Sequence, residues 1–159
     1  MNGRKSSFQS ALERANRWTL FRIEPKGKRV SDAERRQRGM TYFNEVYGGI
    51  VPFPPEHLHD DFLFNTVDQL FSEVWSRPGM SIRDRRLVAI GIIASQAEEM
   101  TFEIQIRAAL HKGELSRDDV KEIVVLLPYY IGYPKASRMR AVTQRIFAEM
   151  DKAAVTAAE

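Results

Sequence analysis

Side chains that could do chemistry gather in three short segments of this 159-residue chain. The first segment holds three arginines at 83–86, the second holds three glutamates and a glutamine at 98–105, and the third holds three tyrosines at 129–133. A guanidinium can bind a carboxylate through two hydrogen bonds, and a glutamate can donate a proton where burial raises its pKa. Each group also has an ordinary alternative, because such residues commonly form ion pairs, structural hydrogen bonds or aromatic packing contacts.

The three histidines offer weaker candidates. His57, His59, Asp60 and Asp61 form a cluster that a metal could use. Adjacent residues of a proline-rich loop rarely converge on one ion, and aspartates at the start of a helix are explained by capping. His111 precedes Lys112-Gly113, where a helix end favours a cation. We therefore expect no metal site and no cofactor.

Composition excludes several function classes. The chain has no cysteine, which removes thiol nucleophiles, disulfide scaffolds and cysteine-ligated metal centres. No apolar run approaches the length of a membrane-spanning helix, and the first ten residues lack the apolar stretch of a signal peptide. These features predict a cytoplasmic, single-domain protein with no membrane contact.

Charge is unevenly distributed along the chain. Residues 1–40 hold 11 Lys and Arg against 4 Asp and Glu, whereas the remainder is acidic overall. A basic arm could bind nucleic acid or an acidic neighbouring subunit. The arm lacks the interleaved aromatic residues of a nucleic-acid platform, so nucleic acid is not an expected partner.

Helix signals follow one another from Ser31 onward. Ser-x-x-acid capping patterns occur at Ser31, Ser81 and Ser116, and glycines or prolines stop the segments that follow. The stretch 87–94, LVAIGIIA, is apolar on every side, which predicts a helix buried at the domain centre or between subunits. No segment sustains a period of two, so the predicted class is an all-α, single-domain helical bundle. The expected helices are 32–48, 61–76, 81–98, 100–112, 116–132 and a last one from Pro134.

Four segments also occur in a recognisable order. RDRRLVAIGIIAS from Arg83 is followed by the IxIRAALxxG segment around Gln105, then by SxxDVxEI from Ser116 and YIGYP from Tyr130. This order resembles the carboxymuconolactone decarboxylase family, whose all-α fold is shared with alkylhydroperoxidase-type proteins. The resemblance covers about residues 40–150, which we expect to form the family domain. The charge distribution marks a basic helical arm at 1–39, and residues 151–159 are expected to form a tail.

The family's pattern has a Glu in R-E-L-V and a His 19 positions later, and its redox branch adds two cysteines 12 and 15 positions after the Glu. In this chain these positions are Arg86 for the Glu, Gln105 for the His, and Glu98 and Thr101 for the cysteines. Peroxidase or disulfide-reductase chemistry is therefore excluded, because it needs a thiolate.

Decarboxylation of a carboxylactone needs a cation for the carboxylate, an apolar pocket and an acid that protonates carbon. Together with these requirements, the family resemblance predicts that the catalytic residues are Arg86, Gln105 and Glu98. The predicted substrate-binding residues are Glu103, Tyr130 and Tyr133.

Two functions remain open. One is a lyase acting on a small anionic, cyclic or lactone-bearing metabolite, and the other is a catalytically degenerate member serving as an oligomeric binding or scaffold subunit. Arg86 and Gln105 lining a closed pocket would favour the enzyme, whereas a pocket filled by aromatic and methionine side chains would favour the scaffold. The resemblance also implies a homo-oligomer: a dimer, trimer or hexamer.

Overall fold

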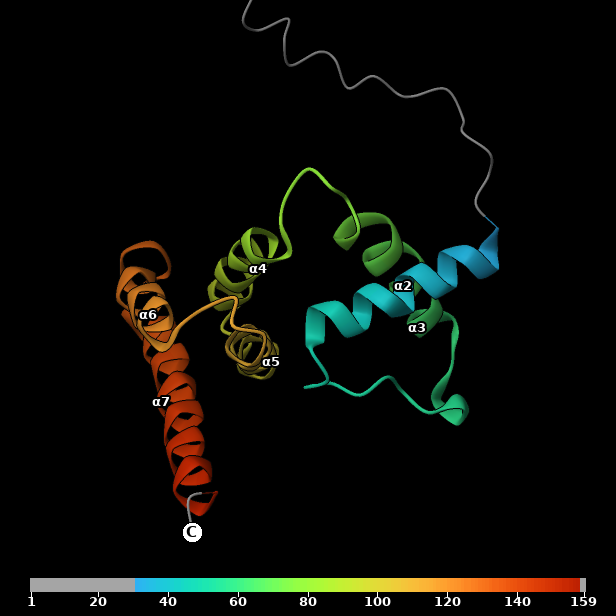
Figure 1. The fold of residues 1–159 in the computed structure, drawn as a ribbon. Coiled ribbons are helices and arrows are strands. Elements are labelled where there is room, and N and C mark those ends of the chain that lie inside the picture. Colours follow the sequence, from blue (N-terminus) through green and yellow to red (C-terminus); the bar gives the residue numbers. More distant parts are fainter. Residues whose placement is uncertain (1–30, 158–159) are drawn as a thin grey trace, which may run out of the picture. The chain divides into compact units, whose positions relative to one another are not determined.

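Residues 31–157 are described by a computed structural model, and they fold almost entirely into helices (Figure 1). No strand occurs among these residues, which confirms the predicted all-α class. In chain order the elements are α2 (Asp32–Tyr47), η2 (Glu56–Leu58), α3 (Asp61–Asn65), η3 (Thr66–Trp75), α4 (Ile82–Gln96), α5 (Glu99–His111), α6 (Arg117–Ile131) and α7 (Tyr133–Thr156).

The predicted capping motifs set the helix starts. Ser31 and Ser116 each form a full capping box, and the Ser81 hydroxyl accepts from the backbone N–H of Asp84. Gly48 ends α2 in the left-handed conformation, with φ of 56°. Local sequence signals therefore place these ends correctly.

The predicted helix at 61–76 differs in its second part. A short α-helix, α3, passes directly into a ten-residue π-helix, η3. This segment packs closely on α2: a Cβ at Gly39 would lie 2.3 Å from the carbonyl oxygen of Val67. The Arg38 guanidinium donates to the Ser72 carbonyl, and Arg36 forms a bidentate pair with Asp68. The spacing of apolar residues within one segment cannot predict long-range contacts of this kind.

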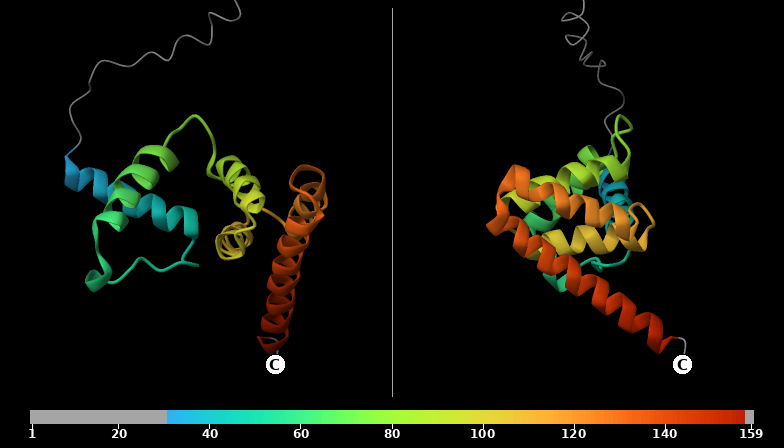
Figure 2. Two further views of the ribbon diagram at one scale, coloured as in Figure 1. Left: turned by 180° about the vertical axis from the view of Figure 1, so that it is seen from behind. Right: turned by 90° about the vertical axis from the view of Figure 1, so that its left-hand side faces the viewer.

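Two apolar clusters hold the helices together. The larger cluster joins α4, α5, α6 and α7 around Ile90, Phe102, Ile106 and Met139. Helices α6 and α7 lie side by side and run in opposite directions (Figures 1 and 2). The second cluster joins α2 and η3 and is mainly aromatic; it includes Phe43, Val46, Phe71 and Trp75.

The apolar stretch at 87–94 is buried on one side only. Ile90 and Ala94 lie in the core, whereas Val88 and Ile92 each expose more than half of their surface. Within residues 31–157, no helix is both long and apolar enough to cross a membrane.

The expected division between residues 39 and 40 falls inside α2, and the expected tail at 151–159 begins inside α7. Residues 1–30 of the expected arm lie outside the described residues.

Candidate functional site

Arg86 lies on the buried face of α4, one and two turns before Ile90 and Ala94. It exposes none of its surface. Its Nε donates to Glu114 Oε2 at 2.7 Å, and its Nη2 donates to Glu114 Oε1 at 3.2 Å and to the Val46 carbonyl at 2.6 Å. One guanidinium therefore ties α4 to α2 and to the turn between α5 and α6.

Gln105 completes this cluster. Its side-chain oxygen accepts from Arg86 Nη1 at 2.7 Å, and the residue is 4% exposed. Arginine can only donate, so this contact fixes the orientation of the amide. The structure thus brings together the two positions that sequence analysis paired, 19 residues apart.

Aromatic side chains pack on the α2 side of this cluster. Val46 belongs to the second apolar cluster, in which Phe43, Tyr47 and Phe71 make edge-to-face contacts. Burial raises the pKa of Tyr47, and the nearby charge of Arg86 partly offsets that rise. The guanidinium has no exposed surface among residues 31–157, and its four hydrogen bonds all go to protein groups. The expected contact between Arg86 and a substrate stays a prediction, and in the described residues the side chain acts as a structural clamp between α4, α2 and the turn before α6.

Glu98 has a capping role. Its carboxylate accepts from the backbone N–H of Thr101 at 2.7 Å, and this hydrogen bond lowers the pKa of Glu98. The side chain is exposed. A proton donor was expected to have a raised pKa through burial, so the condition for that role is not met.

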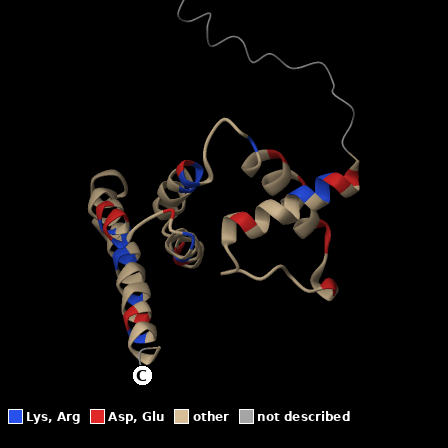
Figure 3. Ribbon diagram, in the orientation of Figure 1, with Lys and Arg blue, Asp and Glu red and all other residues tan. Residues whose placement is uncertain are grey.

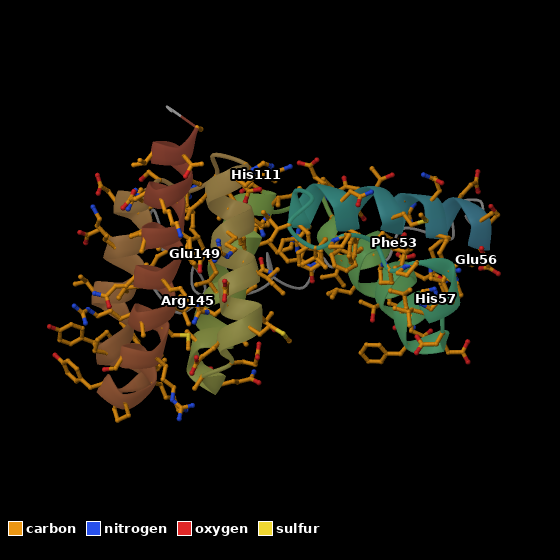
Figure 4. The ribbon with its side chains drawn as sticks, turned by 90° about the horizontal axis from the view of Figure 1, so that it is seen from below. Phe53, Glu56, His57, His111, Arg145 and Glu149 are labelled. Atoms are coloured by element: carbon orange, nitrogen blue, oxygen red, sulfur yellow. The ribbon has the colours of Figure 1, made fainter. Side chains whose placement is uncertain are left out.

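Glu103 lies in a chain of alternating charges between α5 and α7. It accepts from Arg107 at 2.8 Å and from Arg145 at 2.5 Å, and Arg107 also pairs with Glu149. Burial alone would raise the pKa of Glu103, but the hydrogen bonds and charges of the two arginines outweigh it and lower the pKa. Figure 4 shows Arg145 and Glu149 on α7 beside α5.

Tyr130 and Tyr133, at the end of α6 and the start of α7, lie outside both of these clusters. They are 81% and 68% exposed. The structure does not bring them to Arg86 or Gln105 in a shared, closed pocket.

A groove beside α5 was missed by sequence analysis. Its walls are Ile50, Leu110 and Met150, its polar groups are Arg107 and His111, and its volume is about 210 Å³. Arg107 and His111 are four residues apart and so share a helix face. That spacing was the available signal, and His111 was instead assigned to the helix end, where it does lie (Figure 4).

The histidine and aspartate cluster near residue 60 behaves as the capping argument predicted. Asp60 caps α3 by accepting from the backbone N–H of Leu63 at 2.8 Å, and His59 Nε2 lies 2.9 Å from the Pro54 carbonyl oxygen. No set of three or more His, Asp or Glu side chains is arranged to hold a metal in the described part of the chain.

Comparison with known proteins shows that this chain is similar to two proteins named as decarboxylases. The chain is 28% identical over 128 residues to 4-carboxymuconolactone decarboxylase of Acinetobacter baylyi, covering 76% of this chain and 92% of that one. It is 25% identical over 114 residues to a nitrosuccinic acid decarboxylase of Metarhizium robertsii, covering 70% and 74%. The chain is related to the carboxymuconolactone decarboxylase family.

The relationship confirms the predicted resemblance. An uncharacterised protein of Methanocaldococcus jannaschii is also similar, at 20% identity over 103 residues and with 98% of its length covered. No protein-family model matches the chain. The alignment with the carboxymuconolactone decarboxylase spans most of both chains.

Proposed function

We propose that this chain is a decarboxylase-type lyase acting on a small anionic, cyclic or lactone-bearing metabolite, and that the substrate binds in the groove beside α5. Its relatives named as decarboxylases support the reaction class. The groove carries the proposal, because a cation, an imidazole and apolar walls meet there.

Arg107 is the proposed carboxylate-binding group. Its Nε and Nη2 hold Glu103 and Glu149, while its Nη1 has no hydrogen-bond acceptor among residues 31–157. The two ion pairs fix the plane of the guanidinium, and Nη1 is free to donate to a substrate oxygen. The neighbouring Glu149 carboxylate opposes anion binding, so Glu149→Gln is expected to lower the KM for an anionic substrate.

His111 is the proposed proton donor. Loss of CO₂ leaves the bonding electron pair on carbon, and an imidazolium can protonate that carbon near neutral pH. The side chain is exposed, so solvent can return the proton. Ile50, Leu110 and Met150 supply the apolar surroundings that favour loss of the localised carboxylate charge.

The test is CO₂ release from a panel of carboxylactones, β-keto acids and nitro-substituted dicarboxylates. His111→Asn should lower kcat by at least about 100-fold, the usual contribution of a positioned acid. His59→Asn is the matched control, because it makes the same change at a histidine outside the groove, and it should leave kcat unchanged. Equal loss in both variants, or none in His111→Asn, contradicts the assignment.

A second function is favoured by the cluster around Arg86. At the two positions where the family resemblance places an acid–base Glu and His, this chain has a buried Arg–Gln pair whose hydrogen bonds serve the fold. A catalytically inactive binding or scaffold subunit would have this arrangement. It would release no CO₂ from the whole panel, even with protein in excess of substrate.

A further inference from the structure

A second groove follows the seam between α6 and α7, which pack against each other in opposite directions (Figures 1 and 2). It has a wide part of about 300 Å³ and a narrow part of about 90 Å³. Val124 and Arg140 line both parts, so the two parts adjoin each other. We name this feature the α6–α7 groove; its other residues are Lys121, Val125, Pro128, Tyr133, Ala136, Ser137, Thr143, Gln144 and Phe147.

The narrow part of the α6–α7 groove is mainly apolar. Val124 and Pro128 are four residues apart on α6, so they form one row along the helix. Tyr133 and Ala136 line the same part from α7. Residues 123–134 contain no Lys, Arg, Asp or Glu, and the second half of α6 is accordingly tan in Figure 3. The narrow part therefore favours an apolar portion of a ligand.

The wide part holds the positive charge. Lys121 lines it from α6 and Arg140 lines it from α7, whereas no Asp or Glu lines either part. Arg140 is exposed and forms no ion pair with any residue in 31–157. Lys121 pairs with Asp118 at 2.7 Å, but both side chains are largely exposed, so this pair is weak and a ligand can replace it. An anionic group in the wide part would meet a cation from each helix.

The other walls of the wide part also fit a carboxylate attached to a carbon chain. The Phe147 ring lies under the Arg117 guanidinium, 4.4 Å from it, and Arg117 is in turn paired with Asp151. These contacts hold an aromatic wall in place. The exposed Gln144 adds an amide that can donate to an oxygen. The wide part thus has the volume and the mixture of apolar and polar groups of a small-ligand site.

We propose that the α6–α7 groove binds a single-chain amphipathic carboxylate of medium length, with its carboxylate between Lys121 and Arg140 and its chain along Val124 and Pro128. Lys121 and Pro128 are seven residues apart, which is a rise of about 10 Å along an α-helix. An extended eight-carbon chain has a similar length. The α6–α7 groove shares no residue with the groove beside α5, so this inference does not depend on the proposed decarboxylation.

The test is isothermal titration calorimetry of the full chain with octanoate, hexanoate and octylammonium. Octanoate should bind at least about 10-fold more tightly than octylammonium, which has the same chain and the opposite charge, because only the carboxylate can accept from the two cations. Hexanoate should bind at least about four-fold more weakly than octanoate, since burying one CH₂ group changes affinity by a factor of about four. No measurable octanoate binding, or an octanoate affinity equal to that of either other probe, overturns the proposal.

Arg140→Gln tests the position of the carboxylate. This variant should weaken octanoate binding by about 10-fold and should not weaken octylammonium binding. Arg138→Gln is the matched control, because it neutralises a neighbouring exposed cation of α7 that pairs with Glu99 instead of lining the groove. The control should bind octanoate as wild type does. Equal weakening in the two variants, or none in Arg140→Gln, overturns the proposal.

Ser137→Phe tests the position of the chain. Ser137 lines the narrow part and is exposed, so a phenylalanine there would occupy the space of the last carbons. The difference in affinity between octanoate and hexanoate should disappear in Ser137→Phe and persist in Ser137→Ala. Far-UV circular dichroism and thermal unfolding check that both variants keep the fold. A difference that persists in Ser137→Phe overturns the proposal, and so does octanoate binding that His111→Asn weakens and Arg140→Gln does not.

Discussion

Removing the Glu114 carboxylate should destabilise the protein more than removing any exposed carboxylate. Arg86 has no accessible surface, and Glu114 supplies two of its four hydrogen bonds and its only carboxylate partner among the described residues. Glu114→Ala leaves a buried guanidinium without a counter-charge. Breaking a buried pair in this way costs about 3–5 kcal/mol. A domain with about 5–15 kcal/mol of stability would lose a large fraction of it.

The assay is urea unfolding followed by circular dichroism, with Glu45→Ala as the matched control. Glu45 pairs with Lys112 at 2.6 Å, but half of its side chain is exposed, so its loss should cost no more than about 1 kcal/mol. A cost for Glu114→Ala equal to that of the control would refute the idea that Arg86 is a clamp. Replacing both partners, as Arg86→Met with Glu114→Leu, should recover stability, because no unpaired charge remains.

Two further predictions concern packing and pH. Gly39→Ala should lower the free energy of unfolding by about 1–3 kcal/mol, because the new Cβ would clash with the Val67 carbonyl. Gly91 has open space around it, so Gly91→Ala should raise the free energy of unfolding by about 0.5–1 kcal/mol. Urea unfolding midpoints check both changes. Glu103 has a lowered pKa, so its ion pairs stabilise the protein above its ordinary pKa of 4.5, and this contribution is lost as the pH falls through the lower folded-state value. The free energy of unfolding should therefore fall less steeply on acidification in Glu103→Gln than in wild type, and parallel pH profiles would contradict the assignment.

Local signals predicted much of the fold. Capping boxes at Ser31 and Ser116, and the turn at Gly48, depend on neighbours within four residues, so the sequence displays them directly. The π-helix η3 was not predictable in this way. It lies against α2 at Gly39, and such a contact depends on a residue more than twenty positions away.

The candidate site was predicted in part. The pairing of positions 86 and 105 followed from the family pattern, and the structure places the two side chains in contact. The hydrogen bonds that Arg86 makes with Glu114 and with the Val46 carbonyl could not be predicted, because both partners come from distant parts of the chain. Tyr130 and Tyr133 were expected in a substrate site, whereas the structure exposes both side chains. The residues around them in the sequence do not show whether a tyrosine there faces a pocket or the surface.

We propose that the Arg86–Gln105 pair stabilises the fold and that decarboxylation occurs in the groove beside α5. The most direct measurement is CO₂ release by His111→Asn and Gln105→Ala, each compared with wild type and normalised to folded protein. We expect His111→Asn to lose turnover, and Gln105→Ala to lose stability and retain turnover. Turnover that survives in His111→Asn and disappears in folded Gln105→Ala would contradict it.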